Sequence, residues 1–292
     1  MKYHKSVLLK EVVEYLEPKS GDIVLDATFG FGGHSVAILE RLGKKGKIIG
    51  FEKDPRVFKM VSDRIAKNVV LINDDFVNYR KHFDKMGIGR IDKAIFDLGL
   101  SSWHLDKSRL GFSFKGNEEL DMRLDPKSSL TAAQILNSYN KSDLSDVFYY
   151  LSDEYRARQI AEAIVRKRKA RKITRSSELV DIVESVKGTS SSRINPATKV
   201  FQALRIEVNQ ELSSLKKVLD QVIDDLNEEG RLAVISFHSK EDKIVKTIFK
   251  QHCKEGFASI LTKRPVTPTR EELISNPRSR SAKMRVILRR GK

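Results

Sequence analysis

The first hundred residues alternate between short apolar runs and longer segments whose apolar positions recur every three or four residues. These runs predict four buried parallel strands: residues 23–25, 48–51, 69–72 and 94–96. Helical spacing is found before the first strand, at 7–16, and between strands, at 34–42 and 55–65. Such a βαβαβ alternation predicts a doubly wound sheet, whose ligand lies beyond the carboxyl ends of the strands.

The pattern changes after Asp97, because no convincing strand follows until residue 231. The helices predicted in this stretch are 131–139, 144–151, 155–169, 177–186, 197–209 and 211–226. The small polar segment 188–192 resembles a domain boundary. The later predicted elements are a strand, a helix and a closing pair of strands: 231–236, 243–250, 259–262 and 284–288.

Together these elements predict an α/β fold with a doubly wound, Rossmann-like sheet and an inserted all-helical domain. We assign residues 1–104 and 196–292 to the sheet domain and residues 105–195 to the insert. The helices at 197–209 and 211–226 are taken to return the chain to the sheet.

Charge favours nucleic acid as the partner. The formal net charge is +16, and a cationic surface gains free energy from each phosphate that it meets, although such charge also serves solubility or membrane contact. The positive side chains gather in two stretches: Arg156, Arg158, Arg166, Lys167, Arg168, Lys169, Arg171 and Lys172, then Arg278, Arg280, Lys283, Arg285, Arg289 and Arg290. From these we predict Arg166, Arg168 and Arg280 as substrate contacts.

Other features narrow the class of protein. No long uncharged apolar run predicts a membrane span, and the first ten residues lack the pattern of a secretory signal. Cys253 is the only cysteine, which excludes a disulfide framework, and the histidines show no metal-ligand spacing. We expect a cytoplasmic protein without a metal site.

Glycines follow the first predicted strand, in the run DATFGFGGH from Asp26 to His34. Such a strand-to-helix turn lets a ligand approach the backbone. Ser35 replaces the third glycine of a dinucleotide fingerprint, whereas Asp26 can accept a hydrogen bond from an ammonium group, which favours a nucleoside bearing an amino acid. The predicted contacts are Asp26, Gly30, Gly32, Gly33 and His34. Taken alone, the glycines also fit an ordinary tight turn.

Two more residues suit a nucleoside. Glu52, at the end of the second strand, can accept hydrogen bonds from both ribose hydroxyls, and Phe76, past the third strand, can pack on adenine. An isolated glutamate is more often a solvated surface residue, and Phe76 fits core packing equally well. The combination of strand, glycines, helix and acid favours a cofactor pocket.

Around the fourth strand the chain resembles the ribosomal RNA small subunit methyltransferase H family, also called MraW. The matching segments run nearly end to end: HKSVLLKEVVEYL (4–16), DATFGFGGHS (26–35), DLGLSS (97–102), GFSF (111–114), LDMRLDP (120–126), NPATKVFQALRIEVNQEL (195–212), ISFHSKEDKIVK (235–246) and NPRSRSAKMRV (276–286). The resemblance implies a class I methyltransferase sheet and S-adenosyl-L-methionine as cofactor. It also implies N4-methylation of a cytidine in the decoding region of small-subunit (16S) ribosomal RNA.

Matching positions carry the family's cofactor contacts onto Gly32, Gly33, His34, Glu52, Phe76, Asp97 and His104. This sequence has Trp103-His104 where the family usually has Pro-Gln, and Leu110 where it has arginine. Lys199 and Lys240 replace a commoner arginine and leucine. The expected partner is small-subunit rRNA within an assembled subunit; free rRNA and a dimeric state stay open.

The residues after the fourth strand predict the chemistry. We hypothesise that Asp97, helped by Ser101 or by backbone carbonyls of the following turn, accepts a hydrogen bond from the cytosine amine, while Trp103 stacks on the flipped base. His238 is predicted to shape the substrate pocket. The alternatives are a cofactor contact without a proton role for Asp97, a hydrophobic lid for Trp103, and packing or helix capping for His238 and Ser239.

Three other functions compete with this one. An RNA-binding assembly factor would use the same basic insert, but it would not require a complete nucleoside pocket. A DNA amine methyltransferase is the nearest enzymatic rival, followed by a hydride-transferring dinucleotide enzyme.

Overall fold

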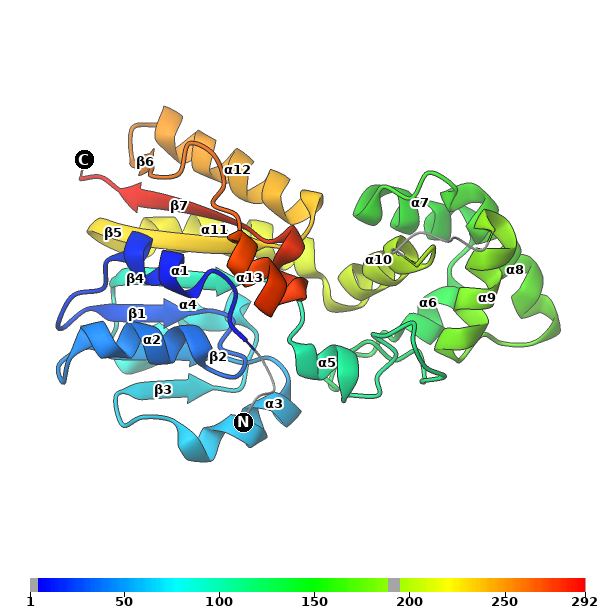
Figure 1. The fold of residues 1–292 in the computed structure, drawn as a ribbon, viewed down its shortest axis with the longest axis horizontal. Helices are drawn as coiled ribbons and strands as arrows, with labels where there is room; N and C mark the ends of the chain where they lie inside the picture. Colours follow the sequence, from blue (N-terminus) through cyan, green and yellow to red (C-terminus); the bar gives the residue numbers. More distant parts are fainter. Residues whose placement is uncertain (1–4, 189–194, 292) are drawn as a thin grey trace. The chain divides into compact units, whose positions relative to one another are not determined.

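The computed structural model describes residues 5–188 and 195–291, and the chain divides into two units (Figure 1). The sheet unit is formed by Met1–Gly99 and Leu212–Lys292, and the insert unit by Leu100–Glu211. The second boundary lies later than the sequence suggested, because helix α10 (Thr198–Asn209) packs on α7 (Lys141–Ser152) within the insert.

The sheet unit contains a mixed seven-stranded sheet in the order β3-β2-β1-β4-β5-β7-β6. Its strands are β1 Ile23–Asp26, β2 Lys47–Phe51, β3 Val69–Ile72, β4 Ile91–Asp97, β5 Leu226–Ser236, β6 Ala258–Ile260 and β7 Lys283–Arg289. The first five strands in this order run parallel, and β7 pairs antiparallel with both β5 and β6. The strand order reverses at β1, which lies between β2 and β4, so the crevice where such sheets bind ligands opens at the carboxyl end of β1.

Helices cover both faces of this sheet (Figure 1). They are α1 Leu9–Leu16, α2 Gly33–Leu42, α3 Pro55–Val61, α4 Tyr79–Met86, α11 Glu211–Asp225, α12 Ser239–Lys254 and α13 Arg270–Ser275. Val24 lies in one buried cluster with Ile38 of α2, whereas its neighbour Leu25 lies in the other with Leu219 of α11. Successive strand residues point to opposite faces, so both kinds of position must be apolar.

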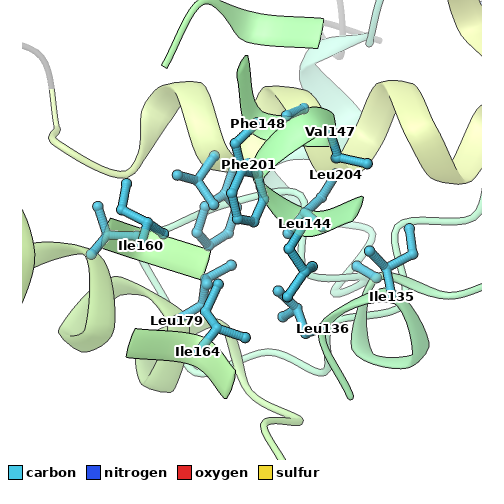
Figure 2. Packing of buried hydrophobic residues seen from close by; sticks show 14 of the residues in the cluster. Ile135, Leu136, Leu144, Val147, Phe148, Ile160, Ile164, Leu179, Phe201 and Leu204 are labelled. Carbon is cyan, nitrogen blue, oxygen red and sulfur yellow. The ribbon is translucent and has the colours of Figure 1, made fainter. Parts of the chain in front are cut away.

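The insert unit has a hydrophobic core of its own. Its helices are α5 Ser102–Asp106, α6 Ala132–Ser138, α7, α8 Ala157–Ala170, α9 Ser176–Lys187 and α10. Figure 2 shows Phe148 of α7 beside Phe201 of α10, with Ile160 of α8 and Leu179 of α9 around them. Every regular element among the described residues of this unit is a helix, which agrees with the predicted all-helical insert.

The structure corrects three details of the sequence prediction. Helix α4 was missed, because only Tyr79 and Phe83 of its residues are buried. The helix predicted over 55–65 ends at Val61 and continues as a short 3-10 turn. Helix α12 is capped by His238, not by Ser239. None of the described helices combines the length and apolar content that a membrane crossing requires.

Candidate cofactor and reaction site

The glycine turn joins β1 to α2 at the switch point of the sheet. Gly30 and Gly32 have φ angles of 53° and 77°, which favour glycine. A Cβ atom at Gly33 would collide with Ser6 Oγ, so a larger residue there requires the Ser6 side chain to move. The turn therefore needs its glycines for its own geometry, and it aims the amino terminus of α2 at the crevice, where backbone N–H groups are available to a ligand.

Glu52 ties the end of β2 to this turn. Its Oε2 accepts a hydrogen bond from Gly30 N at 3.0 Å, and its Oε1 accepts one from Asp54 N at 2.7 Å. Glu52 is only 8% exposed, and this burial raises its pKa to about 8, while the two backbone donors act in the opposite direction. Each carboxylate oxygen has a second lone pair, so Glu52 can still accept hydrogen bonds from a ribose.

Asp26 is satisfied by the turn itself. Its Oδ2 accepts a hydrogen bond from Ser35 Oγ at 2.6 Å, and its Oδ1 accepts one from Thr28 N at 3.2 Å. Burial raises the pKa of Asp26. These bonds anchor β1 to α2, and a contact from Asp26 to the cofactor stays a prediction.

Asp97, at the end of β4, faces His34 of α2. His34 Nε2 lies 2.9 Å from Val7 O, so Nε2 carries the hydrogen and donates it, and the lone pair of Nδ1 faces Asp97 Oδ2 at 3.6 Å. Asp97 Oδ1 is buried and has no hydrogen-bond partner among the described residues. Burial raises the pKa of Asp97 to about 7, with a further contribution from the negative charge of Glu241. Burial also lowers the pKa of His34.

Glu241 is a residue that the sequence analysis missed. It is 2% exposed and lies in the first turn of α12, where its Oε2 accepts hydrogen bonds from Phe237 N and His238 N. His238 Nδ1 accepts in return from Glu241 N, and its Nε2 lies 3.1 Å from Glu241 Oε1. His238 thus caps a helix at the carboxyl end of β5. A glutamate three residues after a capping residue is a recognisable signal, but Ser239 and Asp242 present the same spacing one position later.

Phe76 begins a short 3-10 turn, Phe76–Asn78, just past β3. Its ring packs edge-on against Phe96 with centroids 5.4 Å apart, and the side chain is only half-buried. Part of the ring is therefore core packing, and the rest remains available to an adenine.

Three predicted residues belong to the insert unit, whereas Asp97 belongs to the sheet unit. Ser101 caps α5, with its Oγ 2.9 Å from His104 Nδ1. His104 is buried and packs edge-on between the rings of Trp103 and Phe112. The roles predicted for Ser101, Trp103 and His104 stay predictions.

The predicted basic contacts differ in their surroundings. Arg166 on α8 and Arg280 in the 3-10 turn Pro277–Ser281 are exposed. Arg168 is half-buried and donates to Leu136 O at 2.7 Å, so it also links α8 to α6. In the second basic stretch, Arg285 pairs with Asp242 at 2.7 Å, and Arg289 donates to Ile223 O at 2.8 Å. Part of each basic stretch therefore holds the fold together.

Comparison with known proteins finds relatives that match almost the whole chain. Ribosomal RNA small subunit methyltransferase H of Dictyoglomus turgidum is 43% identical over 291 residues, covering 98% of this chain and 97% of that protein. The protein of the same name from Caldicellulosiruptor saccharolyticus is 40% identical, covering 97% and 98% of the two chains.

Among solved structures, an rRNA methylase from Streptococcus thermophilus aligns with a TM-score of 0.45 at 12% identity over 98% of both chains. Aeropyrum pernix fibrillarin, solved with S-adenosyl-L-methionine, aligns with a TM-score of 0.39 at 13% identity over 96% of this chain and 73% of that one. These distant likenesses do not bear on the reaction. The model of the MraW methylase family, in contrast, matches residues 1–290, and at this coverage and identity the chain belongs to that family.

Proposed function

We propose that this chain transfers a methyl group from S-adenosyl-L-methionine to N4 of a cytidine in the decoding region of small-subunit rRNA. The family is one of methylases, so the reaction is methyl transfer and the cofactor is S-adenosyl-L-methionine. The names of the relatives support small-subunit rRNA as the acceptor. The atom, the base and its position rest on the resemblance of DLGLSS and the other segments to that family.

The residues at the switch point fit this cofactor. A buried carboxylate oxygen of Asp97 has no partner among the described residues, and a Cβ built at Gly99, just beyond it, would meet nothing closer than Phe237 at 3.7 Å. We assign the ribose hydroxyls to Glu52, the adenine to Phe76, and the amino-acid end to Asp26 and the glycine turn. When bound, the cofactor supplies a methyl group activated by a positive sulfur.

Asp97 is the group that can relieve the acceptor of its proton. The lone pair of a cytosine amine is delocalised into the ring, so the amine must be oriented and must lose a proton as the new C–N bond forms. Asp97 Oδ1 accepts a hydrogen bond from that amine and then holds the proton. A pKa near 7 suits this task, because the carboxylate is ionised often enough to accept and basic enough to retain the proton.

His34 positions this carboxylate from its other side. In the acid form of Asp97 that exists before the reaction, an O–H at Oδ2 can donate to the lone pair of His34 Nδ1. The ionised form is the one that accepts the substrate proton at Oδ1. The proposal keeps the substrate roles predicted from sequence for Ser101, Trp103, His104 and His238.

One observation carries this proposal: the ends of β1, β2 and β4 are connected through the glycine turn. Glu52 accepts from Gly30 N, and Asp97 N donates to Thr28 Oγ1 at 2.6 Å. Three acids, Asp26, Glu52 and the partly buried Asp97, thus lie around one turn.

The test offers labelled S-adenosyl-L-methionine with unmethylated small subunits, naked rRNA and DNA, followed by mapping of the product. We expect one N4-methylcytidine in the decoding region and the highest yield on assembled subunits, which would also agree with a cytoplasmic location. Label on DNA alone, or on another atom, would overturn the proposal.

A further inference from the structure

The turn between α7 and α8 presents Tyr155 to solvent in an unusual way. Its side chain is 82% exposed, the highest value among the large hydrophobic residues that the structure describes. Single exposed apolar residues are common, so exposure alone would mean little. Tyr155, however, is held from below: Lys199 Nζ lies 5.0 Å from the ring centroid and donates to Asp153 O at 2.8 Å.

The backbone that carries Tyr155 is also fixed. Asp153 ends α7 in the left-handed conformation, with φ 54°. Glu154 is 3% exposed, pairs with Lys187 at 2.7 Å and accepts from Arg156 N at 3.1 Å. A ring presented on a rigid turn loses little conformational entropy when a ligand stacks on its open face.

Basic side chains continue from this ring along one face of α8. Tyr155 lies just before α8 begins at Ala157. Residues three or four positions apart lie on the same side of a helix, and Arg158, Glu162, Arg166 and Lys169 follow one another at such steps along α8, all exposed. Three of these four side chains are cations. An aromatic platform at the end of a cationic track is the combination that binds unpaired nucleic acid, because phosphates follow the charges and a base stacks on the ring.

We propose that Tyr155 is a stacking platform for an unpaired base of the RNA substrate, whose phosphates follow the exposed face of α8. This inference rests on the proposed rRNA substrate. It separates Tyr155 from Trp103, which is assigned to the target base itself. Lys199 has a positioning role beneath the ring.

The test measures the affinity of the full chain for a fluorescent single-stranded 12-nucleotide RNA, and for the same sequence as a duplex, over a series of salt concentrations. Y155L should raise the Kd for the single strand by about 5- to 150-fold without changing its salt dependence, whereas Y155F should stay within about twofold. R166Q should instead lower the slope of log K against log salt by roughly 0.7. Y150L, at another exposed tyrosine, is the matched control and should change the Kd by less than about twofold.

Equal losses for Y150L and Y155L, or equal losses on single strand and duplex, would overturn the inference, as would a Y155L that lost affinity only for a protein of the small subunit. Methyl transfer to small-subunit rRNA is measured in parallel. If the wild-type chain methylates small-subunit rRNA and Y155L binds the single-stranded RNA as tightly as wild type, only the stacking role of Tyr155 is refuted. If the wild-type chain neither binds nor methylates small-subunit rRNA, the proposed function itself is refuted.

Discussion

Buried carboxylates are the residues on which this site depends. Glu52 is buried and Asp97 largely so. Glu52 is in none of the described ion pairs, and the described ion-pair contact of Asp97 is to His34, whose pKa is lowered by burial. A desolvated acid that a protein retains at a ligand crevice commonly serves a ligand or a reaction. We expect Glu52 to affect the affinity for the cofactor and Asp97 to affect the rate of methyl transfer.

Glu52 should control cofactor affinity. In E52Q the neutral amide accepts weaker hydrogen bonds from the ribose and from Asp54 N, so the Kd for S-adenosyl-L-methionine should rise by about 10- to 100-fold. Isothermal titration calorimetry measures this change, and E228Q, at an exposed glutamate of β5, is the control. A wild-type Kd in E52Q would remove Glu52 from the pocket.

His34 should tune the pH dependence of methyl transfer. The single-turnover rate at saturating cofactor should rise with pH through about 7, since Asp97 must be ionised to accept the proton. In H34Q the glutamine side chain can still donate a hydrogen bond to Val7 O, but the Nδ1 lone pair that stabilises protonated Asp97 is lost. The midpoint of the pH–rate profile should therefore move to lower pH. H252Q is the matched control, because His252 is buried and faces Asp220 at 3.0 Å on the α11–α12 side. An unshifted midpoint in H34Q, or an equal shift in H252Q, would contradict this role.

At the scale of elements, Glu241 at the amino terminus of α12 has two effects, one on the stability of the helix start and one on the pKa of Asp97. Glu241 accepts two backbone hydrogen bonds and raises the pKa of Asp97 through its charge. E241Q can keep an acceptor for those donors while removing the charge, so the midpoint of the pH–rate profile should fall. E241A should also cost about 1–3 kcal/mol of stability, because Phe237 N and His238 N lose their acceptor. Denaturant unfolding and pH–rate profiles separate the two effects, with E255Q at the far end of α12 as control; an unchanged profile in E241Q would refute the coupling.

The centre of the sheet could be predicted from sequence because β1, β2 and β4 are largely buried on both faces and therefore form continuous apolar runs. Helix α4 could not, because its sequence YRKHFDKM offers only Tyr79 and Phe83 to the core. The return from the insert was placed too early, since the periodicity of α10 shows an apolar face but not the helix that covers it.

Some residues of the candidate site could likewise be predicted from sequence, and others could not. Asp26, Glu52 and Asp97 were found because each ends an apolar run, and strand ends meet at one edge. The pairing of His34 with Asp97 was not predictable, because it depends on the angle at which α2 leaves the glycine turn. Glu241 was overlooked because a histidine, not the following serine, caps its helix.

At the scale of the whole molecule, the raised pKa of Glu52 predicts how stability depends on pH without cofactor. Its value rises from 4.5 to about 8, so the folded state favours the protonated form, and stability is lost as pH rises between these values. E52Q lacks this ionisation, so its stability relative to wild type should rise by about 4 kcal/mol as the pH increases from 5 to 9. Urea unfolding at several pH values measures the difference. A difference that stays constant with pH would show that Glu52 has an ordinary pKa.

The proposed reaction depends above all on Asp97 taking the proton of the acceptor amine. It is tested most directly by single-turnover methyl transfer to unmethylated small subunits at saturating cofactor, comparing wild type with D97N. We expect a rate about 100- to 10,000-fold lower in D97N, which neither more cofactor nor a higher pH restores. A D97N variant that transfers the methyl group to cytidine N4 at the wild-type rate would contradict it.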